Sequence, residues 1–111
     1  MLRFNIKQIL VLEELIMIHE LKTIEPFFSH LGCRKKNFEV RKNDRNFNVG
    51  DYLRLRKYDV ETQNYSGDEL LVKVNYILYD ENYCKGGYCI MGIEFVYGPK
   101  ENLKALHGLR A

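Results

Sequence analysis

The chain contains no tryptophan, only two prolines and only three cysteines. So few prolines, with eight glycines, do not make the composition of a linker or of a low-complexity protein. Cys33, Cys84 and Cys89 are odd in number and lack the spacing of a zinc site or a redox motif. An odd number of cysteines without such a spacing predicts that the thiols are reduced and mostly buried, as is usual in proteins of a reducing cytosol. We therefore expect a folded cytoplasmic protein with no metal site and no cofactor.

Long hydrophobic runs are also missing, and a bilayer span takes about 20 apolar residues. Residues 1–16 are rich in isoleucine and leucine, but Arg3, Lys7, Glu13 and Glu14 interrupt them. The segment also lacks the small-residue cleavage site of a signal peptide. We expect no membrane partner, and we expect residues 1–16 to form an amphipathic helical extension. Such a helix would pack on the domain or on a second copy, which predicts a possible homodimer.

The length of 111 residues suits one domain, and 46% hydrophobic with 29% charged residues is ordinary for a globular protein. We divide the chain into the extension 1–16, a domain over 17–98 and a C-terminal helix or tail over 99–111. Strands are predicted over 38–41, 53–56, 70–79 and 88–96, and a long hairpin loop over 59–68.

A short helix is predicted to begin at Pro26 and to stop at Gly32. The first predicted strand alternates apolar and charged residues, which is typical of a half-buried strand. We expect Phe38 and Val40 to face the core, and Glu39 and Arg41 to lie side by side on the other face. Several strands with helices at the ends indicate an α+β fold with a curled sheet or a small barrel.

Positive charge is concentrated in the middle of the chain. Residues 34–57 contain nine bases and three acids, a net +6, whereas the whole chain carries +2. A concentration of bases is expected of a surface that binds phosphate groups. Solvated charges on exposed strand faces explain the charge equally well, so charge alone does not decide between the two.

One stretch of this basic segment carries a motif, together with residues upstream and downstream of it. The residues are His19-Glu-Leu-Lys22, then Lys36-x-x-Glu39-x-Arg41-Lys42-Asn43-Asp44-Arg45, and then Val49-Gly50-Asp51. The motif resembles the ASCH family of the PUA-like superfamily, in particular a small bacterial and phage branch of unknown function. The resemblance implies an α+β fold, namely a PUA-like mixed β pseudo-barrel with flanking helices and a cleft beside a helix. It also implies RNA as a partner, because such folds commonly bind RNA.

The candidate site residues combine this resemblance with their chemistry. Lysine in a partly dry cleft can act as a base or nucleophile, with a carboxylate to tune it. Guanidinium groups bind phosphates, amides can read base edges, and aromatic rings stack on unpaired bases. The candidate catalytic residues are Lys36 and Glu39, and the candidate nucleic-acid-binding residues are His19, Lys22, Lys36, Arg41, Lys42, Asn43, Arg45 and Tyr58.

Each of these residues has a structural alternative. Lys36 and Glu39 can form a simple surface ion pair. Asp44 is expected to hold its loop through backbone hydrogen bonds, and Asn43 also suits a turn. Packing roles are open for His19 and Tyr58.

Three functions follow, in order of preference. The first is a nucleic-acid (RNA) or nucleotide-binding domain with a basic cleft. The second is a small hydrolase that uses Lys36 and Glu39, either an amidohydrolase acting on a modified nucleoside or a ribonuclease. It ranks lower because Glu39 stands where the amidohydrolase-like relatives have threonine. The third is a non-catalytic accessory or interaction protein of a bacterium or phage.

Overall fold

The computed structural model describes residues 17–97, which form five strands and one short helix. The described part is therefore mostly β. Expectations for 1–16 and 99–111 lie outside the described residues. No helix within 17–97 has the length and the apolar character needed to cross a membrane. The elements are β1 (Ile18–Thr23), α2 (Phe27–Gly32), β2 (Phe38–Lys42), β3 (Tyr52–Asp59), β4 (Asn64–Leu78) and β5 (Tyr88–Tyr97).

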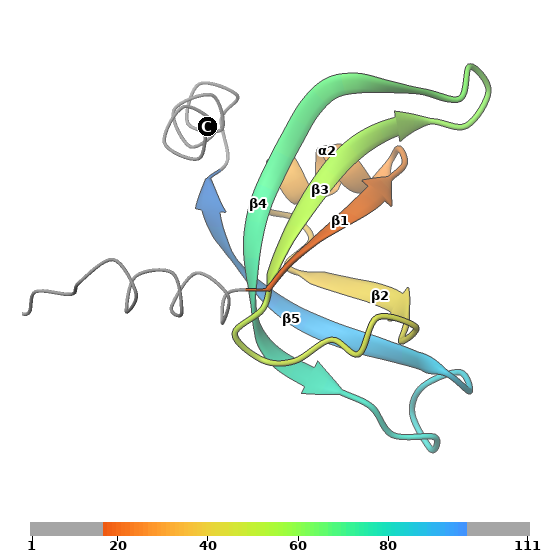
Figure 1. Ribbon diagram of the computed structural model, residues 1–111, viewed down its shortest axis with the longest axis vertical. Helices are drawn as coiled ribbons and strands as arrows, with labels where there is room; N and C mark the ends of the chain where they lie inside the picture. The colour runs from red at the N-terminus through yellow and green to blue at the C-terminus, as the bar shows by residue number, and fades with distance from the viewer. Residues whose placement is uncertain (1–16, 98–111) are drawn as a thin grey trace, which may run out of the picture.

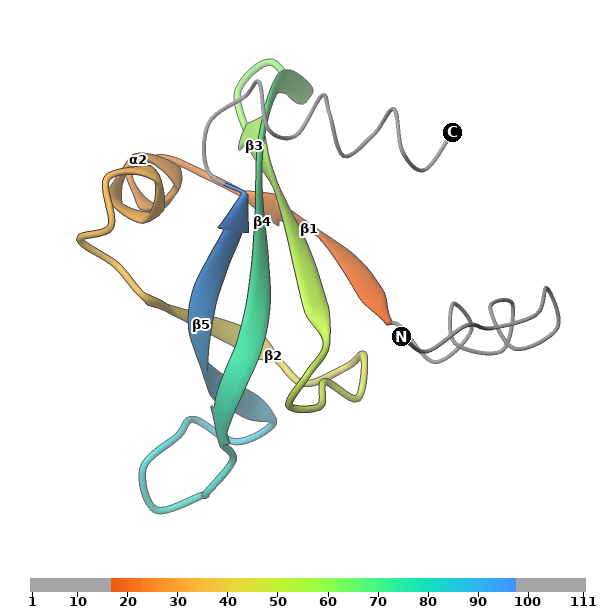
Figure 2. The same cartoon turned by 90° about the vertical axis from the view of Figure 1, so that its left-hand side faces the viewer.

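All five strands belong to one mixed sheet with the order β1-β3-β4-β5-β2. β1 pairs with β3 in parallel, and the other neighbours are antiparallel. The sheet curls into a half-barrel, which Figure 1 shows along one direction and Figure 2 after a quarter turn. The predicted curled, mixed sheet is confirmed at this level.

The curl is concentrated in β4, which has 15 residues and pairs with both β3 and β5. Its register against β5 shifts between Val74 and Tyr76, so that Asn75 is an extra residue. Its register against β3 also shifts, near Gly67, whose φ is +96°. An extra residue on one strand bends that strand and increases the local twist. The bulges therefore let one long strand serve both halves of the curled sheet.

The hydrophobic core lies on the inner face of the curl. Alternate residues of the central strands, such as Leu53, Val72 and Met91, are fully buried there. α2 adds Leu31, which is also fully buried, and Phe28 packs against the same cluster. Burial of each such side chain contributes about 1.5–3 kcal/mol relative to exposure. The helix is thereby fixed against the inner side of the sheet.

The expected orientation of β2 is wrong. Phe38 and Val40 are 42% and 49% exposed, whereas Glu39 is only 2% exposed. β2 is an edge strand, and Glu39 is tolerated on its inner face because Lys36 and Arg41 both bind its carboxylate. The expectation that Glu39 and Arg41 share a face is correct, but that face is the inner one.

One further strand and one loop boundary differ from expectation. β1 was not predicted, although its buried residues alternate with exposed ones from His19 to Thr23. The loop over 59–68 is shorter than expected, because β4 begins at Asn64 and Tyr58 pairs with Tyr65. A left-handed residue, Gln63 with φ 56°, ends the turn. The predicted helix and the strands β2, β3 and β5 are confirmed within a few residues of their ends, whereas β4 begins six residues before its predicted start at residue 70.

Candidate functional site

A cleft of about 450 Å³ lies where the two edges of the sheet approach each other beside α2. Residues 22–24 line it from β1 and the segment that follows, and Phe27 lines it from α2. Lys36 and residues 38–41 line it from the side of β2. The cleft therefore brings together segments from both ends of the sheet order.

The carboxylate of Glu39 is the centre of the polar contacts in this cleft. Lys36 donates a hydrogen bond from Nζ to Glu39 Oε1 at 2.8 Å, and Arg41 donates from Nε to Oε2 at 2.9 Å. Lys36 also donates to the backbone oxygen of Phe38 at 2.7 Å. Charge-assisted bonds of this length are among the stronger hydrogen bonds in proteins. They fix both cations in the cleft.

Arg41 also reaches across the open edge of the half-barrel. Its Nη2 donates to Thr23 Oγ1 on β1 at 3.3 Å, and Thr23 is 3% exposed. These bonds engage Nε and Nη2, and a guanidinium group has five N–H donors. Donors therefore remain for an oxygen atom of a ligand.

Two phenylalanine rings form the apolar part of the cleft. Phe27 and Phe38 are 46% and 42% exposed, which is unusual for such large apolar side chains. The ammonium group of Lys36 lies 5.7 Å from the ring centre of Phe27 and 4.9 Å from that of Phe38. The cation thus lies within cation–π range of two exposed rings.

Of the predicted site residues, the structure brings Lys22, Lys36, Glu39 and Arg41 together along the cleft. Lys22 also lies over the ring of Tyr58, 4.4 Å from its centre. Tyr58 itself packs edge-on against Tyr65, with 5.1 Å between ring centres, and does not line the cleft.

His19 lies elsewhere, in a buried contact of its own. Its Nε2 is 2.9 Å from Asp51 Oδ2, and its ring meets that of Phe47 edge-on at 4.7 Å. Asp51 also accepts a hydrogen bond from the backbone of Asn48. This contact joins β1 to the turn before β3, which is the packing role considered as an alternative for His19.

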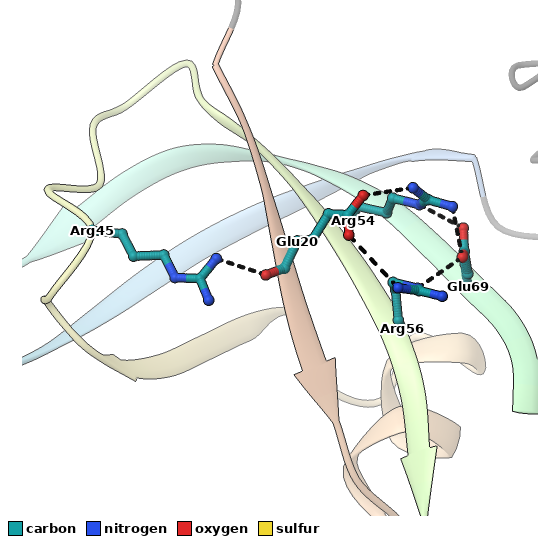
Figure 3. Close-up of polar contacts among 5 residues, drawn as sticks. All are labelled: Glu20, Arg45, Arg54, Arg56 and Glu69. Carbon is teal, nitrogen blue, oxygen red and sulfur yellow. Dashed lines mark hydrogen bonds and ion pairs between the residues drawn. The ribbon is translucent and has the colours of Figure 1, made fainter. Parts of the chain in front are cut away.

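The other three predicted binding residues lie at or after the end of β2, outside the lining of the cleft. Lys42 is exposed. Asn43 accepts a hydrogen bond from the backbone of Phe47 at 3.2 Å, so it has the turn role considered as its structural alternative. Arg45 donates to the backbone oxygen of Glu20 at 2.7 Å, as Figure 3 shows.

Part of the basic segment is neutralised by acids that lie outside it in the sequence. Arg54 donates two hydrogen bonds to Glu69, at 2.7 and 2.8 Å, and one to Glu20 at 2.7 Å (Figure 3). Arg56 donates to Glu69 at 3.1 Å. The hydrogen bond to Glu69 raises the pKa of Arg54 above its usual value. The net charge counted along the segment therefore overstates the charge available to a ligand.

Sequence reasoning missed Thr23, Phe27 and Phe38 as residues of the site. Phe38 was expected to face the core, because large apolar residues are usually buried, and no site role was considered for Phe27. Nothing in the sequence marks Thr23, because its contact with Arg41 depends on the curl of the sheet.

Among residues 17–97, no group of three or more histidine, cysteine, aspartate or glutamate side chains is placed to hold a metal ion. The cleft instead offers cationic donors, one buried carboxylate and two rings. These groups suit the binding of a small anion that carries a flat or apolar part.

Residues 18–93 match the family described as "Domain of unknown function (DUF3850)". No curated protein matches the chain. The match runs from the start of β1 into β5, so it includes every residue that lines the cleft. The chain therefore belongs to the DUF3850 family of domains of unknown function.

Proposed function

We propose that the cleft binds an unpaired nucleotide, either within single-stranded RNA or free. The observation that carries the proposal is the pair of cations, Lys36 and Arg41, which buried Glu39 fixes beside two exposed phenylalanine rings. A phosphate takes the remaining donors of Arg41, and a base stacks on a ring. The resemblance of the motif to the ASCH family of PUA-like folds supports the same ligand class.

The size and charge of the cleft suit this ligand. Pockets for small molecules usually measure about 300–1,000 Å³, and this cleft has about 450 Å³. Lys22, Lys36 and Arg41 line it against the single carboxylate of Glu39, so its lining is cationic. Arginine presents a planar fork that matches phosphate oxygens, and aromatic faces accept any base.

Binding of labelled single-stranded RNA, measured by fluorescence anisotropy, tests the proposal. Arg41→Gln and Lys36→Gln should each weaken binding roughly tenfold, because each loses a charge-assisted bond to phosphate. Affinity should also fall steeply between about 50 and 200 mM salt. Lys35→Gln is the matched control, since Lys35 is exposed and outside the lining. Salt-independent binding, or equal affinities in all three variants, would refute the proposal.

A second candidate function is hydrolysis of a modified nucleoside or of RNA. It is favoured by the contact of 2.8 Å between Lys36 and Glu39 at the cleft. In the structure, however, the ammonium group already donates to Glu39 and to the backbone oxygen of Phe38. A lysine that acts as base or nucleophile must first give up these partners, which is why binding ranks first.

Glu39→Gln separates the two candidates. The amide keeps a hydrogen-bond acceptor but removes the negative charge beside Lys36 and Arg41. In a binding site this change weakens RNA affinity, because the amide has one acceptor oxygen for two cations and no longer fixes both, and the wild-type chain shows no turnover. In a hydrolase of the proposed kind it abolishes turnover, which chromatography of the reaction products measures.

An accessory role through self-association is the third candidate. It depends on residues 1–16, which lie outside the described residues. Light scattering of the whole chain and of a chain lacking 1–16 tests it, and a monomer in both cases would refute it.

A further inference from the structure

A second hollow, of about 330 Å³, lies on the outer face of the sheet where β2, β5 and β4 run side by side. Phe38 and Tyr76 line it from the two flanking strands, and Gly92 lies between them on the middle strand. Phe38 also lines the cleft described above. The two hollows therefore share one aromatic side chain.

The register of the strands makes this hollow a slot between two rings. Phe38 pairs with Gly92, and Gly92 pairs with Tyr76, so the three positions form one row across the sheet. Neighbouring strands lie about 4.8 Å apart, which places the flanking backbones about 10 Å apart. A flat ring in contact on both faces needs about 7–8 Å, at contact distances of 3.5–4.0 Å. The spacing between the flanking backbones exceeds this requirement by about 2 Å, so contact with both rings requires the side chains of Phe38 and Tyr76 to tilt toward each other.

Gly92 forms the floor of the slot, and its lack of a side chain leaves room there for Asn75. A Cβ atom at this position would lie 2.7 Å from Asn75 Oδ1 and 3.3 Å from Tyr76 Cβ. Glycine therefore allows the carboxamide of Asn75 to lie over β5. A carboxamide carries a donor and an acceptor side by side, the combination that pairs with the edge of a nucleobase.

The aromatic walls are open to solvent, with Tyr76 64% and Phe38 42% exposed. Exposed rings on a sheet surface are the groups on which several RNA-binding domains stack unpaired bases. The ammonium group of Lys36 lies 4.9 Å from the centre of the Phe38 ring. Lys36 thus lies next to Phe38, the ring that both hollows share. There its ammonium group can bind the phosphate that joins two stacked nucleotides.

We infer that the slot between Phe38 and Tyr76 is a second base-stacking subsite for single-stranded RNA, one nucleotide step away from the cleft. The inference rests on the proposed function and deepens it, because it favours an RNA strand over a free nucleotide. One base stacks in the cleft on the inner side of Phe38, and its neighbour stacks in the slot on the outer side.

The variant Tyr76→Ala tests the inference. It should weaken binding of an RNA hexamer roughly tenfold, the usual loss when one base loses its aromatic partner. Binding of a nucleoside monophosphate should stay within about twofold, because the cationic cleft holds it. The salt dependence for the hexamer should also stay unchanged, since stacking releases no counterions. Tyr76→Phe should bind as the wild type does, and Tyr83→Ala, in an exposed loop position, is the control.

A second variant checks the floor of the slot. Gly92→Ala should weaken hexamer binding by a similar factor, because the new methyl group displaces the Asn75 carboxamide. That carboxamide is the end of an exposed, flexible side chain, so the fold should survive, which circular dichroism verifies.

The outcomes separate the two proposals. A hexamer affinity that depends on Arg41 but not on Tyr76 overturns the second subsite and leaves the cleft standing. Absence of RNA binding by the wild-type chain overturns both. Self-association that Tyr76→Ala abolishes would identify this face as an interface between copies and would also overturn the inference.

Discussion

Glu39 determines the chemistry of the cleft at the scale of single residues. A carboxylate that is 2% exposed is costly to bury unless cations or donors surround it. Lys36 and Arg41 satisfy this need, and in return the carboxylate holds them in place. Prearranged cations bind an anion without first losing side-chain freedom, which favours affinity.

Two of the three thiols, Cys33 and Cys89, should differ sharply in reactivity. Cys89 is fully buried, and this burial raises its pKa, whereas Cys33 is exposed. The thiolate is the reactive form, so a raised pKa leaves less of it at any given pH. We expect Cys33 to react with a disulfide reagent much faster than Cys89 does. Cys89 should react only at higher pH or after unfolding.

Reaction of the native protein at pH 7, followed by absorbance, measures this difference, and Cys33→Ser is the control that removes the fast phase. Equal rates for Cys33 and Cys89 would contradict the burial of Cys89. The exposure of Cys33 also corrects the expectation that the thiols are mostly buried.

At the scale of elements, one cluster of charges joins three strands on the outer face of the sheet. Glu69 of β4 binds Arg54 and Arg56 of β3, and Glu20 of β1 binds Arg54 (Figure 3). Glu69 is 8% exposed, so its carboxylate is partly shielded from water. The cluster ties the parallel pair β1–β3 to the antiparallel remainder of the sheet.

Glu69→Ala should lower the free energy of unfolding by about 2 kcal/mol, because it removes the buried carboxylate that Arg54 and Arg56 share and leaves them only the exposed carboxylate of Glu20. Urea denaturation followed by circular dichroism measures the loss. Glu94→Ala is the matched control, because Glu94 lies exposed on β5 and should change stability by less than about 0.5 kcal/mol. Equal stabilities of the two variants would show that the cluster contributes nothing to folding.

Sequence reasoning predicted the elements whose apolar periodicity is regular. Leu53 and Leu55 alternate with arginines, and the structure buries both leucines, so β3 was predicted correctly. β2 has the same alternation, but its buried face carries Glu39. Alternation shows that a strand has two different faces, and the fold decides which face lies inside.

The candidate site was predicted in part for a similar reason. Lys36, Glu39 and Arg41 are close in sequence, and their contacts are local. His19 and Asn43 stand in the same motif, yet each has a structural partner that sequence spacing does not reveal, namely Asp51 and the backbone of Phe47. Long-range pairings such as that of Arg54 with Glu69 depend on strand register, which the sequence alone leaves open.

For the molecule as a whole, the open side of the half-barrel is the feature that matters most. β1 and β2 are the two edges of the sheet, and side chains connect them. Arg41 donates to Thr23, and Arg45 donates to the backbone oxygen of Glu20. Unpaired strand edges are usually covered or charged, which prevents pairing with other chains. Here two arginines partly cover the edge of β1.

Arg45→Ala should loosen the edge strand without unfolding the protein. The lost bond to Glu20 contributes about 1 kcal/mol, so the β1 amides that pair with β3 should exchange with deuterium roughly fivefold faster. Native-state hydrogen exchange measures this change, with Lys42→Ala as the exposed control. Unchanged exchange in β1 would mean that Arg45 does not secure the edge.

The way this side is closed has a mechanical consequence. A complete barrel would have to break a row of backbone hydrogen bonds to widen. Within residues 17–97, the side chains that bond to β1 across the gap are those of Arg41 on β2 and Arg45 in the loop after it. The two edge strands can move apart while every strand keeps its backbone pairing with its neighbour. A bulky ligand that enters between the two edge strands would therefore break the hydrogen bonds of Arg41 and Arg45 but no backbone hydrogen bond of the sheet.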